Sequence, residues 1–199
     1  MSRFCWNPDK CDAELNSALR LVSLYHGEWI AEKDGESELL FRRGVENEVK
    51  VTQKNGRWSV EAGSVSGFLR GVSHVFAGVE TEETAPFKTL GVMFDCSRNK
   101  VFRLDWMKKT LVKLALTGYN MAMLYTEDTY LLPGEPFFGY MRGAYRMEEL
   151  KELDAFAKKL GIELIGCIET LGHLEQILAY GEYAKVRDTA SVLMVDAPE

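Results

Sequence analysis

The stretch Gly91-Val-Met-Phe-Asp95-Cys-Ser-Arg98-Asn99 is a short apolar run that ends in a polar cluster. Asn120-Met-Ala-Met-Leu-Tyr125-Thr-Glu-Asp128 repeats this pattern, and Ile162-Glu-Leu-Ile-Gly-Cys-Ile168 leads in the same way into Glu169-Thr-Leu-Gly-His173. Short apolar runs separated by helices are typical of parallel strands, whose carboxyl ends meet at one edge of the sheet. The three clusters therefore predict a site at the carboxyl edge of a parallel β/α barrel.

Two predicted helices connect these strands, and each of them ends at a glycine. Strand, helix, strand, helix and strand are expected over 89–95, 103–117, 119–125, 146–160 and 162–168. Gly118 and Gly161 close the helices, and an apolar strand follows each glycine at once, as in βαβ units with right-handed crossovers. The long segment from Thr129 to Tyr145 indicates that the elaborated loops lie on the rim that carries function.

The residues before this sheet predict a small α+β domain. Asp12 is a candidate N-cap for a helix that ends near Gly27. Three strands and a second, amphipathic helix are expected over 38–42, 48–52, 57–61 and 64–76. Asn55-Gly56 predicts a tight hairpin, because both residues tolerate positive φ. The polar segment 81–86 predicts a linker, so we expect the small domain over 1–86 and the β/α units over 87–199.

The second half is too short for a complete barrel. A short helix is expected over 174–180 and a fourth strand over 191–195. A closed eight-fold barrel needs roughly 250 residues, and fewer than half of these are available from Gly91 onward. The predicted fold class is therefore α/β, an incomplete TIM-type barrel of three to four β/α units behind a small α+β domain. Its open edge predicts self-association of the chain.

Composition narrows the classes of partner. The 199 residues are 46% hydrophobic and carry a formal net charge of −6, with no cluster of Lys and Arg, which argues against a nucleic-acid or anionic membrane surface. No apolar run has membrane-spanning length and the start lacks a secretory signal, so we expect a cytoplasmic protein. Cys5, Cys11, Cys96 and Cys167 have no metal-ligand spacing, and we expect reduced thiols and no metal site.

Four motifs give the chain a family likeness. In order, they are Asp95-Cys-Ser-Arg98-Asn99, Leu116-Thr-Gly-Tyr-Asn120, Leu124-Tyr-Thr-Glu-Asp128 and Ile168-Glu-Thr-Leu-Gly-His173. This series resembles the opening strands of glycoside hydrolase family 20, the β-N-acetylhexosaminidases. Tyr125-Thr-Glu-Asp-Thr-Tyr130 and Phe138-Gly-Tyr-Met-Arg-Gly143 look especially like a bacterial intracellular branch of that family.

The resemblance implies a hydrolytic activity, and it implies that the catalytic carboxylates lie outside this chain. The family hydrolyses terminal N-acetylglucosamine or N-acetylgalactosamine with retention, using the acetamido group of the substrate, and needs no cofactor or metal. Its catalytic Asp-Glu pair follows the fourth strand, and the end of this chain contains no such pair. The resemblance therefore implies an N-terminal portion of such an enzyme, which alone is inactive. The alternatives are a non-catalytic carbohydrate-binding or structural half-barrel and another barrel-type hydrolase.

The resemblance also assigns expected roles to five residues. Arg98 looks like the arginine that grips the non-reducing sugar, with an ordinary ion pair to Asp95 as the alternative. Asp128 and His173 resemble a supporting relay behind the catalytic acid, although Leu171 stands where the family has proline. Glu127 and Glu169 are expected to bind substrate at the same rim. Simple solvation is the alternative for the acidic pair Glu127 and Asp128.

Aromatic residues crowd the long loop after the second strand. They are Tyr125, Tyr130, Phe137, Phe138, Tyr140 and Tyr145. Aromatic faces stack on sugar rings, which suits a carbohydrate cleft. The same side chains are also suited to packing the loop against its own barrel, and this is the favoured interpretation for most of them.

Overall fold

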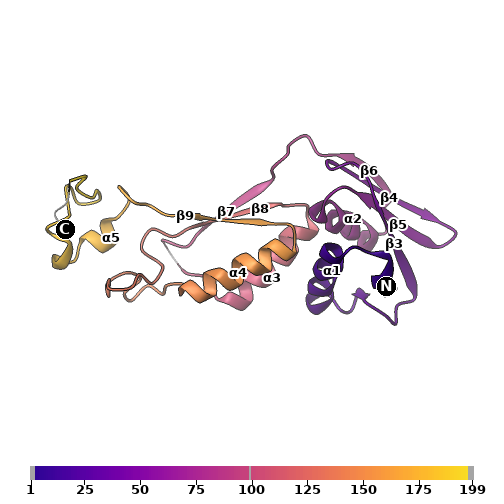
Figure 1. The fold of residues 1–199 in the computed structure, drawn as a ribbon, viewed down its shortest axis with the longest axis horizontal. Helices are drawn as coiled ribbons and strands as arrows, with labels where there is room; N and C mark the ends of the chain where they lie inside the picture. Colours follow the sequence, from indigo (N-terminus) through magenta and orange to yellow (C-terminus); the bar gives the residue numbers. More distant parts are fainter. Residues whose placement is uncertain (1–2, 99, 197–199) are drawn as a thin grey trace.

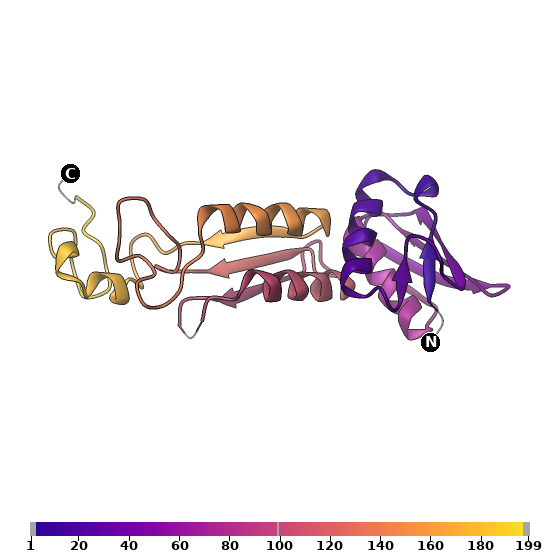
Figure 2. The same cartoon turned by 90° about the horizontal axis from the view of Figure 1, so that it is seen from below.

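The computed structural model describes residues 3–98 and 100–196, so residues 1–2, Asn99 and residues 197–199 lie outside the described chain. The molecule is elongated, with an N-terminal α+β part at one end and a β/α part extending from it (Figures 1 and 2). None of the helices in the described ranges is long and apolar enough to cross a membrane.

The N-terminal part is a six-stranded mixed sheet covered by two helices. The strands run in the order β2-β1-β3-β5-β4-β6. They are β1 (Phe4–Trp6), β2 (Ile30–Ala31), β3 (Ser37–Arg43), β4 (Glu48–Lys54), β5 (Arg57–Ala62) and β6 (Thr81–Thr84), and a short 3-10 turn, η1 (Pro8–Lys10), follows β1. The helices α1 (Ala13–Tyr25) and α2 (Val65–Ala77) lie between this sheet and the second part (Figure 1).

Local sequence signals explain the ends of these elements. Asp12 caps α1 by accepting a hydrogen bond from the Leu15 amide at 2.8 Å, and Ser64 caps α2 in the same way. Asn55 and Gly56 both have positive φ, 51° and 77°, and form the predicted hairpin between β4 and β5. The helices, strands and hairpin expected here from the sequence are therefore confirmed.

The predicted linker over 81–86 was wrong in most of its length. Residues 81–84 form β6, which pairs antiparallel with β4 from Val51↔Thr81 to Glu48↔Thr84. The segment lacks apolar periodicity because it lies at the edge of the sheet, where Lys50 and Glu82 pair across the two strands. The connection between the two sheets is thus shortened to residues 85–90.

The second part is a three-stranded parallel sheet with helices on one face. Its strands, in the order β7-β8-β9, are β7 (Gly91–Asp95), β8 (Met121–Tyr125) and β9 (Glu163–Cys167). The helices α3 (Leu104–Leu116) and α4 (Met147–Lys159) lie side by side against the same face of the sheet (Figure 1). Ala122 and Leu124 are buried on that face, whereas Met93 on the other face is 52% exposed.

The predicted fourth strand over 191–195 is not present. That segment forms only an isolated bridge between Arg187 and Leu193. Leu193 packs instead on the short helix α5 (Glu175–Leu178), which is followed by the 3-10 turn η2 (Gly181–Tyr183). The described residues therefore contribute three barrel-type strands, because the apolar side chains after β9 are used in a small separate core.

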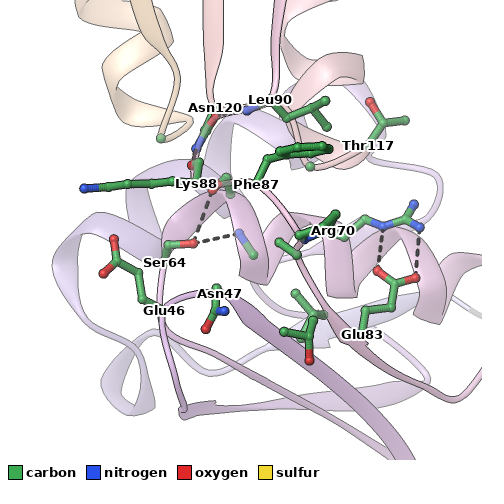
Figure 3. A pocket seen from close by; sticks show the side chains of 18 of the residues that line it. Glu46, Asn47, Ser64, Arg70, Glu83, Phe87, Lys88, Leu90, Thr117 and Asn120 are labelled. Atoms are coloured by element: carbon green, nitrogen blue, oxygen red, sulfur yellow. Dashed lines mark hydrogen bonds and ion pairs between the residues drawn. The ribbon is translucent and has the colours of Figure 1, made fainter.

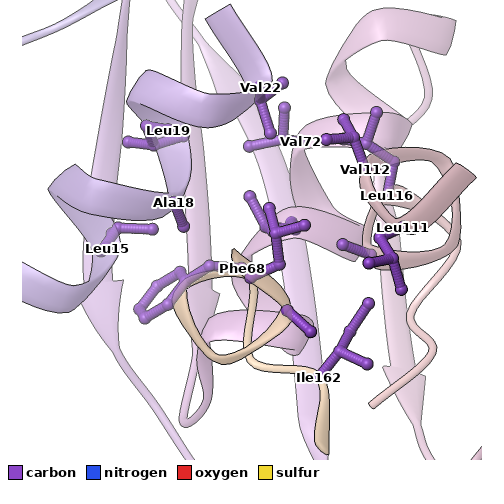
Figure 4. Packing of buried hydrophobic residues seen from close by; sticks show 14 of the residues in the cluster. Leu15, Ala18, Leu19, Val22, Phe68, Val72, Leu111, Val112, Leu116 and Ile162 are labelled. Carbon is purple, nitrogen blue, oxygen red and sulfur yellow. The ribbon is translucent and has the colours of Figure 1, made fainter. Parts of the chain in front are cut away.

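The two parts share one hydrophobic core. Helix α2 packs on the sheet of the first part and on α3 of the second. The buried side chains of this junction, shown in Figure 4, include Phe68, Val72, Leu111, Val112, Leu116 and Ile162. The β/α part is thus held rigidly on the small α+β part, and the carboxyl ends of its strands point away from it (Figure 2).

Candidate active-site rim

Parallel pairing brings the three predicted polar clusters to one edge. Asp95 is in register with Tyr125, and Tyr125 is in register with Cys167, so the three strands end at the same level. The Thr126 amide donates to the Cys167 carbonyl at 3.1 Å and continues the pairing past the strand ends. The polar residues that follow each strand therefore surround one rim, as the sequence predicted.

The most unusual feature of this rim is a pair of buried acidic residues. Glu127 and Asp128 are only 1% and 2% exposed. Glu127 also has a positive φ of 48°, which a residue with a side chain rarely adopts. A carboxylate that is removed from water destabilises the fold unless it is paired. The solvated alternative for these two residues is therefore wrong, and their partners define the site.

Glu127 is paired through only one of its two oxygens. Its Oε1 accepts a hydrogen bond from Nη1 of Arg98 and another, at 3.2 Å, from the hydroxyl of Tyr125. Its Oε2 is buried and has no hydrogen-bond partner among the described residues. Hydrogen bonding to Glu127 raises the pKa of Arg98, and burial raises the pKa of Tyr125 to about 12, so both donors stay protonated at neutral pH.

Asp95 organises the turn that presents Arg98. One carboxylate oxygen accepts from the Ser97 amide at 2.8 Å, from the Ser97 hydroxyl at 2.7 Å and from the Arg98 amide at 3.3 Å. These bonds, led by the Ser97 hydroxyl, hold the pKa of Asp95 below its usual value. The guanidinium of Arg98 pairs with Glu127 instead of Asp95, and the Arg98 side chain remains 52% exposed.

Asp128 is paired with Arg142, which the sequence analysis did not single out. Arg142 lies in the long loop and donates from Nη1 to Oδ1 of Asp128. It is presented by a turn in which Gly139, Met141 and Gly143 all have positive φ. The glycines on either side of this arginine are the signal in the sequence that would have indicated such a turn.

The predicted relay between Asp128 and His173 is not formed. His173 is 63% exposed, has a positive φ, and lies 3.9 Å from Glu169, measured from Nδ1 to Oε2. Asp128 is buried against Arg142 on the neighbouring loop. The two residues share the rim, but each has another partner because the turn after β9 extends outward into solvent. Their roles in catalysis, and those of Glu127 and Glu169 in binding, remain predictions.

Asp128 is expected to make stability depend on pH. Burial raises its pKa, which the Arg142 guanidinium partly offsets, so the folded protein keeps this proton where the unfolded chain has lost it. The resulting stabilisation is complete below about pH 3.9 and is lost as pH rises through the folded pKa. Urea unfolding at pH 4 and pH 7 measures this effect. We expect the free energy of unfolding of wild type, relative to that of Asp128→Asn, to be lower at pH 7 than at pH 4. A constant or rising difference would show that burial of this carboxyl is not costly.

The aromatic side chains of the long loop mostly pack against protein. Phe137 stacks on Tyr180 with ring centroids 4.5 Å apart, and Phe138 meets Tyr130 and Tyr183 edge to face. Tyr145 is buried under the rim. The packing interpretation is confirmed for these residues, whereas Tyr140 is 50% exposed.

A cleft lies at the opposite edge of the β/α sheet. It has a volume of about 1100 Å³ and is lined by the start of α2, by residues 83–88 and by the turns that precede β8 and β9 (Figure 3). Its Arg70 is paired with Glu83, and the Asn120 side-chain amide bonds to the backbone of Lys88 and Leu90. Within the described ranges, no group of three His, Cys, Asp or Glu residues is placed to hold a metal ion. The rim is therefore the better candidate site, because it contains buried charge that is incompletely paired.

No protein-family model and no curated protein matches the sequence significantly. Its structure is similar to solved enzymes of glycoside hydrolase family 20. The β-N-acetylhexosaminidase of Streptomyces coelicolor A3(2) matches 98% of this chain with a TM-score of 0.74 and 17% identity. The exo-β-N-acetylglucosaminidase of Vibrio harveyi, solved with N-acetylglucosamine, matches 98% with a TM-score of 0.73 and 17% identity.

These matches establish the fold and its extent. The chain spans 49% of the Streptomyces coelicolor enzyme and 39% of the Vibrio harveyi enzyme. A third match, the Streptomyces plicatus N-acetyl-β-hexosaminidase, has a TM-score of 0.72 over 96% of this chain at 16% identity, and 46% of that enzyme is covered. The chain therefore has the fold of less than half of such an enzyme, and the predicted incomplete barrel behind an α+β part is confirmed.

Proposed function

We propose that this chain is part of a family 20 glycoside hydrolase that removes terminal β-linked N-acetylhexosamine residues, and that its rim binds the terminal sugar. The observation that carries the proposal is the Arg98–Glu127 pair. The half-exposed guanidinium presents donors, and the buried Oε2 of Glu127 needs one. One of two adjacent sugar hydroxyls accepts from the guanidinium, and the other donates to Glu127 once the Arg98 side chain shifts and uncovers the carboxylate.

The chemistry of this proposal is divided between this chain and residues outside it. The rim supplies binding and orientation through Arg98, Glu127 and their support from Tyr125 and Asp95. The acid and the polarising carboxylate of the family mechanism have no counterpart in this sequence. We therefore expect the chain to bind the sugar without hydrolysing it.

A binding experiment with a matched analogue tests the proposal. Ligand-detected NMR would compare N-acetylglucosamine with its 4-deoxy analogue, which lacks one hydroxyl of an adjacent pair. We expect the parent sugar to bind about tenfold more tightly, because a lost hydrogen bond to a charged group weakens binding by about that factor. Failure of N-acetylglucosamine to bind, or equal binding of both sugars, would contradict a role for the rim in sugar recognition.

We also propose that the uncovered face of the β/α sheet associates with a second copy of the chain. Met93 is exposed on that face, in the edge strand β7, and the outer edges of β7 and β9 are unpaired within the described residues. Exposed apolar surface and free strand edges favour association. A second copy of the chain offers the same unpaired strand edges. The matched Streptomyces coelicolor enzyme is about twice as long as this chain, so part of that enzyme has no counterpart here to cover the face.

Sedimentation velocity distinguishes this association from a stable monomer. We expect the wild-type sedimentation coefficient to rise with protein concentration, and Met93→Glu to abolish the rise. Met147→Glu is the matched control, because Met147 is equally exposed but lies on α4, on the helical side of the sheet. A compact wild-type monomer at all concentrations, or equal effects of both substitutions, would disprove association through this face.

A further inference from the structure

A small pocket lies in the α+β part, away from the rim. It has a volume of about 260 Å³, and the residues that line it are Phe4, Trp29, Trp58, Val75, Phe76, Ala77 and Gly78. The rim lies at the carboxyl ends of β7, β8 and β9, which point away from the α+β part (Figure 2). The pocket is therefore separate from the candidate site, and we call it the aromatic pocket.

The aromatic side chains of this pocket come from four different segments of the fold. Phe4 lies in β1, Trp29 directly precedes β2, Trp58 lies in β5, and Phe76 lies in the last turn of α2. The Trp29 ring meets the Phe76 ring edge to face, with centroids 5.1 Å apart and an interplanar angle of 70°. Phe4 stacks beside Phe76 with centroids 6.2 Å apart. The rings that line the pocket are thus steeply inclined to one another, as the walls of a cage are.

Backbone hydrogen bonds and burial hold these rings in place. The Trp29 amide donates to the His26 carbonyl at 2.9 Å, and the Trp29 carbonyl accepts from the Phe4 amide at 2.8 Å. Trp58 is almost completely buried. Phe4, Trp29 and Phe76 are only partly buried, so a ligand can reach the pocket from solvent. A site built in advance from rigid side chains loses little entropy when it binds a ligand.

The aromatic pocket also lies at the negative end of a helix. Ala77 and Gly78 form the C-terminus of α2, a helix of 13 residues, where the macrodipole favours a positive charge. The carbonyl groups of Phe76 and Ala77 accept no backbone hydrogen bond from another described residue. His74, the basic residue of the last turn, lies 2.9 Å from Glu83 on β6 and does not line the pocket. Since the faces of aromatic rings are negative as well, a cation is the ligand whose charge complements this pocket.

The lining distinguishes an organic cation from a sugar or an anion. Apart from two indole N–H groups, the side chains that line the pocket have no hydrogen-bonding group, so sugar hydroxyls would lose their partners there. Among the described residues, no lysine or arginine lines it to hold an anion. A quaternary ammonium group donates no hydrogen bond and is attracted to aromatic faces within about 6 Å of the ring centroids. The pocket is smaller than the volumes of about 300–1,000 Å³ that hold drug-sized ligands, so the cation must be small.

We propose that the aromatic pocket binds a small free organic cation that carries a trimethylammonium group. The methyl groups of this cation pack on the apolar walls, and its charge is attracted to the rings of Trp29 and Phe76 and to the C-terminus of α2. This binding site goes beyond the proposed function and does not depend on it, because it uses none of the residues of the rim.

Choline and its neutral isostere 3,3-dimethyl-1-butanol test this site on the whole chain. The four tryptophans give four indole N–H signals in NMR spectra. Trp29 and Trp58 report on the pocket, whereas Trp6 donates to Asn16 and Trp106 is exposed on α3. We expect choline to shift the signals of Trp29 and Trp58 but not that of Trp106, and to bind about tenfold more tightly than the neutral alcohol.

Substitutions of Trp29 identify the source of this preference. Trp29→Leu should abolish the preference for choline over the alcohol, whereas Trp29→Phe should keep part of it, because phenylalanine retains an aromatic face. Trp106→Leu is the matched control, since Trp106 is 56% exposed and lies outside the pocket, and it should bind like wild type. A thermal melt verifies that each variant is folded, and the two ligands compared on wild type decide the question if Trp29→Leu is not.

Four results would overturn the cation site. Equal binding of choline and the alcohol would show an apolar pocket without recognition of charge. Unshifted signals of Trp29 and Trp58, or a preference for choline that survives in a folded Trp29→Leu, would place any binding elsewhere. Co-sedimentation of the chain with phosphatidylcholine vesicles would place the trimethylammonium group on a lipid instead of a free molecule. Each of these results leaves the proposed binding of sugar at the rim standing.

Discussion

Replacing Arg142 with Met is expected to lower the free energy of unfolding by about 3 kcal/mol at pH 7, because it leaves a buried carboxylate without its guanidinium partner. The Asp128 side chain is almost completely buried, and Met preserves much of the apolar volume of arginine. The loss should be smaller at pH 4 than at pH 7, because burial raises the pKa of Asp128 and more of this carboxyl is neutral at the lower pH. Urea unfolding followed by circular dichroism measures both values.

Two variants identify the cause of that loss. Arg142→Met combined with Asp128→Asn should recover most of the stability, since the buried charge is then gone. Arg103→Met is the matched control, because its ion pair with Asp105 is exposed, and it should leave the free energy of unfolding nearly unchanged. A change of less than about 1 kcal/mol in Arg142→Met would show that this pair does not fix the loop.

Replacing Arg98 with Lys is expected to weaken binding of N-acetylglucosamine by about tenfold or more. Lysine keeps a positive charge beside the buried Glu127, so the fold is retained, but it loses the planar fork that reaches two hydroxyls at once. Ligand-detected NMR gives the affinity, and urea unfolding shows whether stability is kept. Arg20→Lys, at an exposed arginine on α1 in the α+β part, is the control and should bind like wild type.

An unchanged affinity in Arg98→Lys would mean that the guanidinium serves only to neutralise Glu127. Glu127→Gln separates these roles further. Its amide nitrogen cannot accept a hydrogen bond from the sugar, so binding should weaken even though the side chain keeps its size. Weakened binding in both variants is the result expected if the two residues act on the same ligand.

Periodic elements of this fold could be predicted from the sequence, because helices with glycine ends and alternating strands carry local signals. The helix capped by Asp12 and the hairpin at Asn55-Gly56 are examples. The strand β6 could not be predicted in this way. Its polar sequence becomes a strand only through pairing with β4, which is a tertiary effect.

The candidate site also combines features that the sequence predicts with features that only tertiary contacts determine. Successive parallel strands predicted which polar clusters would share a rim, and the register of β7, β8 and β9 confirms it. The individual partners depend on loop conformation. Arg98 pairs with Glu127, Asp128 pairs with Arg142, and His173 remains in solvent near Glu169. Glu127 has a positive φ, which sets the direction of its side chain, and no residue spacing in the sequence predicts that backbone conformation.

The most direct test of the central claim is to locate bound N-acetylglucosamine on the chain by amide chemical-shift mapping. We predict the largest shifts at Ser97, Arg98 and Glu127, whose backbone and side chains form the rim. Shifts confined to Gly67, Arg70 and Gly118, which line the cleft at the opposite edge of the sheet, would contradict the claim that the sugar binds at the carboxyl edge.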